Sequence, residues 1–233
     1  MTGMKNGLLA AVVLLVACGQ AIPGNGSADA KAPGAREKKL DVAGLTIGMS
    51  VPQTVAVLKA AGWSLTEDKG YSWEQDVNNE LSRQDAAGRQ FDYNKKGVGS
   101  LIGTKGDERV VVEFSSAPSP QLGRIKEVRY EAPAPGRTAQ QMVAELSRKY
   151  GAPDYSGAPG LSAGATWCVA GPVCANGRGF GTRTVLFGGQ RSLGMGGGMA
   201  IRMIQGRDAS ALRDAELLRA TASAAGTRGK PSY

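Results

Sequence analysis

Two segments that lie 88 residues apart carry the same pattern for a short capped helix, and this pair constrains the fold more than any other feature. The first begins at Ser50 and the second at Thr138, and each has a glutamine three residues later, at Gln53 and Gln141, which is the spacing of a capping box. Apolar residues at helical spacing follow, and each pattern ends at a glycine suited to a left-handed helix end. We therefore expect two tandem copies of one unit, although two unrelated capped helices would share these features.

Runs of alternating apolar residues follow each helix pattern and indicate strands. The expected strands cover 98–104, 109–114, 124–131, 165–170, 182–187 and 199–204. Because a helix buries one apolar stripe against one apolar sheet face, each helix should cover its own antiparallel strands. The residues expected to face the helices are Val110, Val112 and Phe114 in the first unit, and Val185, Phe187 and Ile201 or Met203 in the second. The predicted fold class is α+β, with further helices over 72–84 and 208–225.

The N-terminal 39 residues differ in character from the rest of the chain. The run from Leu8 to Ala17 is apolar, follows Lys5 and is too short to cross a bilayer as a helix, which is typical of a signal peptide. Residues 19–39 are rich in Gly, Ala, Pro and Lys and predict a flexible tether. The expected order is a signal peptide (1–17), a tether that starts at Cys18 (18–39), a first α+β unit (40–135), a second α+β unit (136–207), and a C-terminal helix with a frayed tail (208–233).

The apolar run ends in Leu15–Cys18, which resembles the lipobox of bacterial lipoproteins. This resemblance implies that Cys18 receives diacylglycerol on its sulfur, becomes the N-terminus after cleavage and is then acylated on nitrogen. Several acyl chains on one residue would hold the protein firmly in a membrane. Gly19, where an Asp would favour retention in the inner membrane, favours the outer membrane, with the protein facing the periplasm. The alternatives are an ordinary signal peptide cleaved after Gly19 or Ala21, or a plain anchor helix.

The segment Ile47–Ser50, together with the helix pattern that follows it, resembles small periplasmic modules of the BamE type and the related tandem fold of beta-lactamase inhibitory protein. The resemblance covers residues 44–115 and, more weakly, 138–204. Members of this group bind other proteins and are not enzymes, so the resemblance implies a non-catalytic binding role. No position in this chain matches a binding residue of the group by motif.

The chain contains no histidine, which removes the usual general base and the commonest metal ligand. We therefore expect no catalytic residue, no metal site and no cofactor. The stretch Gly160–Gly164 matches the G-x-S-x-G pattern of hydrolases, but a loop precedes it and a strand pattern follows it, whereas the hydrolase motif needs a strand before the serine and a helix after it. Asp76 and Glu80 share one face of an expected helix, which we interpret as a solvated face rather than an acid/base pair.

Cys168 and Cys174 lie on either side of a short stretch that contains Gly-Pro. In an exported protein such a pair favours a disulfide that closes a loop. Two free thiols or a metal-binding pair are the alternatives, and a metal site would need further soft ligands.

The net charge of +8 suits an anionic membrane surface or a solvated basic surface, and an exported protein meets no nucleic acid. The sequence thus predicts a lipid-anchored periplasmic protein with a non-catalytic binding or structural role at the cell envelope. Its expected partners are the membrane, through acyl chains on Cys18, and another envelope protein. The alternatives are an envelope enzyme that hydrolyses cell-wall polymer with carboxylates, and a carrier of a small ligand or lipid.

Overall fold

The computed structural model of the chain describes residues 38–84, 91–118, 123–158, 161–169, 183–191 and 198–228. These residues form the helices α1 (Val51–Ala60), α2 (Trp73–Gln84), α3 (Ala139–Tyr150) and α4 (Arg207–Arg228). The strands are β1 (Ser64–Gly70), β2 (Gly97–Lys105), β3 (Glu108–Ser115), β4 (Arg124–Pro133), β5 (Tyr155–Ser156), β6 (Ala163–Cys168), β7 (Val185–Arg191) and β8 (Gly198–Ile204). Within this described part of the chain, no helix has the length and apolar character that a membrane crossing requires.

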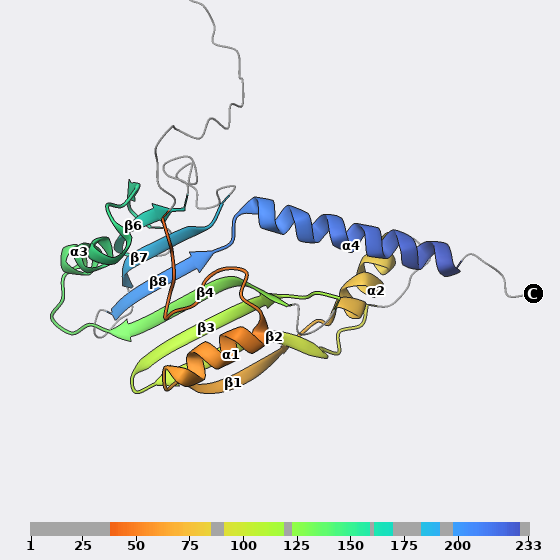
Figure 1. Cartoon of the computed structure of the whole chain (residues 1–233), viewed down its shortest axis with the longest axis horizontal. Coiled ribbons are helices and arrows are strands. Elements are labelled where there is room, and N and C mark those ends of the chain that lie inside the picture. Colours follow the sequence, from red (N-terminus) through yellow and green to blue (C-terminus); the bar gives the residue numbers. More distant parts are fainter. Residues whose placement is uncertain are drawn as a thin grey trace, which may run out of the picture. The chain divides into compact units, whose positions relative to one another are not determined.

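All eight strands belong to one antiparallel sheet, in the order β1-β2-β3-β4-β8-β7-β6-β5 (Figure 1). The mixed α+β class is as predicted, but the strands expected in two units form one continuous sheet rather than two. Along the chain, α1 precedes β1 to β4 and α3 precedes β5 to β8. The last strands of the two sets, β4 and β8, pair in the middle of the sheet. Two helices stand outside this regular pattern, because α2 separates β1 from β2 and α4 follows β8.

Both predicted capping boxes are present. The backbone N–H of Ser50 donates to Gln53 Oε1 over 2.9 Å, and the N–H of Gln53 donates back to Ser50 Oγ over 3.4 Å. The corresponding distances between Thr138 and Gln141 are 2.8 and 3.3 Å. Each box satisfies two backbone donors that a helix otherwise leaves unpaired at its start. The glycines that follow the two helices have positive φ angles, +81° at Gly62 and +79° at Gly151.

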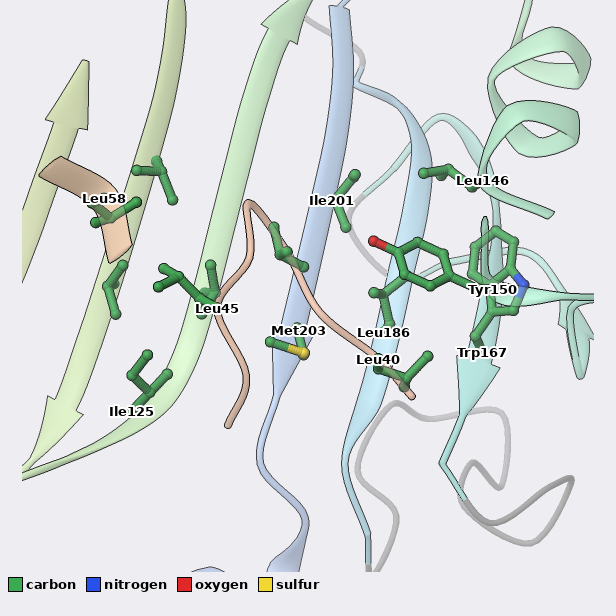
Figure 2. Close-up of a cluster of buried hydrophobic side chains, with 14 of the residues drawn as sticks. Leu40, Leu45, Leu58, Ile125, Leu146, Tyr150, Trp167, Leu186, Ile201 and Met203 are labelled. Carbon is green, nitrogen blue, oxygen red and sulfur yellow. The ribbon is translucent and has the colours of Figure 1, made fainter. Parts of the chain in front are cut away.

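One hydrophobic core lies between the sheet and the two helices α1 and α3. Leu58 of α1 and Leu146 and Tyr150 of α3 are buried in the same cluster. The residues before α1, 38–45, form what we call the strap, and its Leu40 and Leu45 are buried in this cluster too. Figure 2 shows the strap crossing the middle of the sheet, with Leu45 towards Leu58 and Leu40 towards Tyr150. The strap therefore fills the space between the two helices and joins the apolar faces of both strand sets into one core.

Polar contacts hold the strap to the second half of the chain. The ammonium group of Lys38 lies 2.7 Å from Asp154 Oδ2, and that of Lys149 lies 2.8 Å from Asp41 Oδ2. The phenol of Tyr150 donates a hydrogen bond to the backbone carbonyl of Asp41. The folded part is thus already fixed at Lys38, close to the end of the expected tether.

The predicted facing residues are correct for the first helix and partly wrong for the second. Val110, Val112 and Phe114 share the core with Leu58. Ile201 and Met203 also lie in this core, but Val185 and Phe187 lie on the opposite face of the sheet, in a small cluster with Cys168 and Ile204. The core residue of β7 is instead Leu186, which pairs with Met203. Since β7 is apolar on both faces, alternation could not identify its inner side.

Candidate functional site

The face of the sheet turned away from α1 and α3 presents the candidate site, and we call it the open face. Successive side chains of a strand point to opposite faces, so the neighbours of the buried Val112 and Val128 point to the open face. The strand register places one residue from each strand in a row across this face, which we call the central row. From β1 to β5 it contains Thr66, Ile102, Val111, Arg129, Arg202, Phe187, Thr166 and Tyr155. Phe187 and Thr166 are buried, so the accessible part of the row that a partner could cover runs from Thr66 to Arg202.

Two arginines stand directly opposite each other at the middle of the central row, Arg129 on β4 and Arg202 on β8. Like charges at opposed positions destabilise a sheet, so this arrangement needs compensation. Glu127 supplies it, because its carboxylate accepts from Arg202 Nε at 2.8 Å and Nη2 at 3.0 Å and lies 3.1 Å from Arg129 Nε. The hydrogen bonds from Arg202 to Glu127 raise the pKa of Arg202 above its usual value. The positive charge at the centre of the open face is therefore permanent.

The ion pairs continue along β3 and β4. Arg129 also contacts the carboxylate of Glu113, and Lys126 Nζ lies 3.5 Å from the same carboxylate. Arg191 of β7 pairs with Glu131. Partly exposed ion pairs contribute only about 0–1 kcal/mol each to stability. The fold therefore gains little from this density of charge, which makes recognition a better explanation for it.

A hollow of about 260 Å³ adjoins the central arginines. Its lining combines the guanidinium groups of Arg129, Arg191 and Arg202 with the apolar side chains of Leu161 and Phe187. On the other side of the arginine pair, Ile102 and Val111 are only half-buried. Arginines flanked by apolar surface are enriched where proteins bind other proteins.

A larger cavity of about 620 Å³, which we call the α2–α4 cavity, lies at one end of the open face. Its walls come from β1, β2, β3 and β4 and from the two helices outside the regular pattern. Charged side chains of both signs line it: Lys69, Lys95, Lys126, Arg213, Asp68, Asp76, Glu113 and Asp214. Since Glu113 and Lys126 also belong to the charged network on the open face, the cavity and that face are continuous.

The expectation that Asp76 and Glu80 lie on a solvated face is wrong, because their side chains are only 20% and 16% exposed and Asp76 is bound within this cavity wall. Arg213 Nη2 donates to Asp76 Oδ2 at 2.7 Å and to Ser116 Oγ at 2.9 Å, and the Ser116 hydroxyl donates to Asp76. Glu80 lies 2.7 Å from Arg83 on the same helix. The cluster ties together the start of α2, the end of β3 and the first turns of α4, so it fixes the shape of the cavity.

The three tryptophans lie in different environments. Trp63 and Trp167 are buried in the core, where the ring of Trp63 meets that of Tyr130 edge-on at 6.3 Å between centroids. Trp73, at the start of α2, lines a small pocket of about 120 Å³ beside Tyr71 and Pro118, among other residues. We call this the Trp73 pocket. Trp73 is thus the tryptophan that a ligand on this side of the molecule would contact.

The cysteines singled out in the sequence are only partly covered by the structure. Cys168 is fully buried at the end of β6, and its backbone N–H donates to Asp154 at 2.8 Å. Cys18 and Cys174 lie outside the described residues, so the lipid attachment and the disulfide remain predictions.

The serine of the G-x-S-x-G match has a structural role. Both the N–H and the hydroxyl of Ser162 donate to the carbonyl of Gln190 at 3.0 Å, next to the pairing of β6 with β7. Ser162 therefore precedes a strand, as the sequence indicated, and does not stand at a strand-to-helix turn.

The residues that the sequence did not single out are the arginines of the open face and Arg213. Strand 124–131 carries charged residues between its apolar ones, which could have indicated a charged sheet face. Over the ranges that the structure describes, no three His, Cys, Asp or Glu side chains gather as a possible metal site. Comparison with known proteins finds no matching family model, no matching curated protein and no matching solved structure.

Proposed function

We propose that this chain is a lipid-anchored periplasmic protein that binds another envelope protein through the open face of its sheet, without catalysis. The central row carries the proposal, because it sets the permanent charges of Arg129 and Arg202 beside the half-buried apolar side chains of Ile102 and Val111. Arginine with adjoining apolar surface is the chemistry of binding hot spots. A partner with acidic side chains beside apolar ones would complement this row.

The state of the cavity carboxylates favours binding over hydrolysis. A carboxylate mechanism needs two facing acids, one of which is available to give a proton. Of the four carboxylates that line the α2–α4 cavity, Asp76 and Asp214 pair with Arg213 and Glu113 pairs with Arg129. Asp68 is the one that makes no ion pair in the described ranges, so the cavity does not offer two unpaired acids that face each other. A carrier of an apolar ligand would need a deep apolar cavity, whereas this cavity is lined by charged groups.

We also infer that the two strand sets are copies of one unit, as the resemblance to the tandem inhibitor fold implies. The support is the order of elements, a helix followed by four antiparallel strands, which occurs twice. Both helices begin with a reciprocal capping box. β4 pairs with β8 in the middle of the sheet, and from this pair outwards each set follows in reverse order, β4 to β1 on one side and β8 to β5 on the other. A twofold axis between Arg129 and Arg202 would produce this strand order.

The proposed anchor leaves the folded part free to reach a partner. The 20 residue-to-residue steps from Cys18 to Lys38 would span at most about 70 Å when extended, at about 3.3–3.6 Å per step. The fixed end of this tether is Lys38, which is held by Asp154 and by a backbone hydrogen bond to Val169.

The proposal is tested by photo-crosslinking in intact cells. A photoreactive amino acid at Val111 should give a discrete adduct with an envelope protein, and one at Lys59, which is exposed on α1, should not. Arg129→Glu and Arg202→Glu should each remove the Val111 adduct, because each reverses one of the central charges. Equal adducts at both positions, or none at Val111, would contradict binding through the open face.

A further inference from the structure

The α2–α4 cavity and the Trp73 pocket are neighbours, and we call the two together the cleft. Both are lined by Tyr71, Val98, Ser115 and Ser116, which form a shared wall between a large charged compartment and a small one. The small compartment is lined by Val51, Trp73 and Pro118 among other residues, and Glu74 and Lys96 also border it. The large compartment, at about 620 Å³, lies within the range of 300–1,000 Å³ that is usual for ligand pockets. The small compartment, at about 120 Å³, is well below that range and suits a single side chain.

The walls of this cleft are held in place before any ligand binds. The N–H groups of Ser72 and Lys96 both donate to Gln75 Oε1, at 3.0 and 3.1 Å. Asn79, two turns of helix from Ser72, accepts from the N–H of Asp92 at 3.0 Å. Gln75 and Asn79 are only 4% and 6% exposed, so these bonds are shielded from water. They fix the segment that carries Lys95 against α2, and a preformed cleft loses little entropy when it binds.

The charges left over in the large compartment have both signs. Asp76 and Asp214 pair with Arg213, and Glu113 is engaged by Arg129 and Lys126. Lys95 and Asp68, in contrast, make no ion pair with another residue in the described ranges, and both line the compartment. A ligand that carries one negative and one positive group would therefore be complementary to it.

We propose that this cleft binds an extended peptide segment of the partner protein, with an apolar side chain in the Trp73 pocket and charged side chains of both signs in the α2–α4 cavity. The inference rests on the proposed function and names the part of the partner that enters the cleft. A polypeptide fits because it offers, at a rise of about 3.3 Å per residue, apolar and charged side chains in succession. The cleft opens on Glu113 and Lys126 of the open face, so a partner seated on the central row lies next to its mouth.

Trp73 provides the signal for a direct test on the full chain, purified from membranes in detergent. Its indole lines the small compartment, whereas Trp63 and Trp167 are buried in the core and give a constant background. The probes are the capped tripeptides Lys-Leu-Glu and Glu-Leu-Lys, which present the same three side chains in opposite order. At least one should change the fluorescence saturably, with a Kd below about 1 mM.

Charge variants show whether the tripeptide occupies the proposed place. Lys95→Glu and Asp68→Lys should each weaken binding about tenfold, because each places a like charge against one end of the ligand. Lys59→Glu on α1 is the matched control and should leave the Kd unchanged, as Lys59 lies on the other side of the sheet. Capped Gly-Leu-Gly, which lacks both charges, should bind at least about tenfold more weakly than the better charged peptide.

Several outcomes would overturn the inference. They are the absence of a saturable change up to about 10 mM peptide, binding that both cleft variants leave intact, and saturable binding of N-acetylglucosamine in place of the peptides. If the cleft fails in this way while the Val111 adduct persists in cells, the peptide inference alone is wrong. If neither is observed, the proposed function is wrong as well.

Discussion

The strap gives the sharpest test of the single core, through the substitution Leu45→Ala. Leu45 is fully buried in the cluster that also contains Leu58 of α1 and Leu146 of α3. Truncation of a buried leucine to alanine costs about 2–5 kcal/mol, and the cost is higher where the surrounding side chains cannot collapse into the cavity. Because the strap is enclosed by both helices and the sheet, we expect about 3–5 kcal/mol for Leu45→Ala. At roughly 2–4 °C per kcal/mol for a domain of this size, Tm should fall by about 6–20 °C.

Fluorine NMR during urea unfolding can follow both halves of the sheet in one sample. The chain has three tryptophans, so 5-fluorotryptophan gives three signals, of which Trp63 reports the first strand set and Trp167 the second. If the core is shared, both signals should lose their native intensity at the same urea concentration and shift together in the variant. Leu212→Ala is the control, because Leu212 is 73% exposed, and should change stability by less than about 0.5 kcal/mol. Separate transitions for Trp63 and Trp167, or a shift of only one, would refute the shared core.

Four further predictions concern the lipid anchor, the disulfide, the buried Leu58 and the phenol of Tyr130. Cys18→Ser should leave the precursor uncleaved by the lipoprotein signal peptidase, and normal processing on an immunoblot would refute the lipobox assignment. Alkylation of protein isolated without reductant should find Cys168 and Cys174 joined, and two reactive thiols would refute the disulfide. Leu58→Ala should cost about 2–5 kcal/mol in urea unfolding, since Leu58 is fully buried. Burial raises the pKa of Tyr130 to about 12. The neutral phenol therefore contributes fully to the free energy of unfolding below pH 10, and this contribution is lost as the pH rises from 10 to about 12. The absorbance titration of the native protein minus that of Tyr130→Phe should show a step near pH 12, and a step near pH 10 would contradict this.

Local signals in the sequence predicted the helices well. The capping boxes at Ser50 and Thr138 depend on residues only three positions apart, so the sequence displays every partner. The helix over 73–84 was predicted from the spacing of its apolar residues, and its own box between Ser72 and Gln75 follows the same rule. Such contacts need no tertiary context, which explains why prediction succeeded there.

Two strands were not predicted, and their positions in the sheet explain why. β1 is an edge strand with the sequence Ser-Leu-Thr-Glu-Asp-Lys-Gly, and most of its side chains are exposed. β5 contains only two residues, at the opposite edge. Edge strands often carry charged residues that discourage pairing with other molecules, and such sequences lack the apolar alternation that reveals a strand. The alternation of apolar residues therefore could not predict the strand at either edge of the sheet.

The candidate site depended on contacts that no local pattern contains. Asp76 and Arg213 are far apart in the sequence, and only the packing of α4 on α2 brings them together. Arg129 and Arg202 become opposed because β4 pairs with β8, a pairing that joins the ends of the two strand sets. The charged residues of strand 124–131 could have indicated a charged sheet face, but not which strand would lie beside it.

The alternation along β4 separates folding from recognition at neighbouring positions. Val128 is fully buried in the core, and Arg129, the next residue, is exposed on the open face. Since the ion pairs of Arg129 are partly exposed, removing them costs only about 0–1 kcal/mol each, whereas truncation of a buried side chain such as Val128 costs several times more. Substitutions on the open face therefore leave the fold largely intact. If Arg129→Glu loses the partner adducts but keeps its urea midpoint, the loss reports the binding surface itself rather than an unfolded protein. If the variant loses both the adducts and its folding stability, the separation of folding from recognition is false.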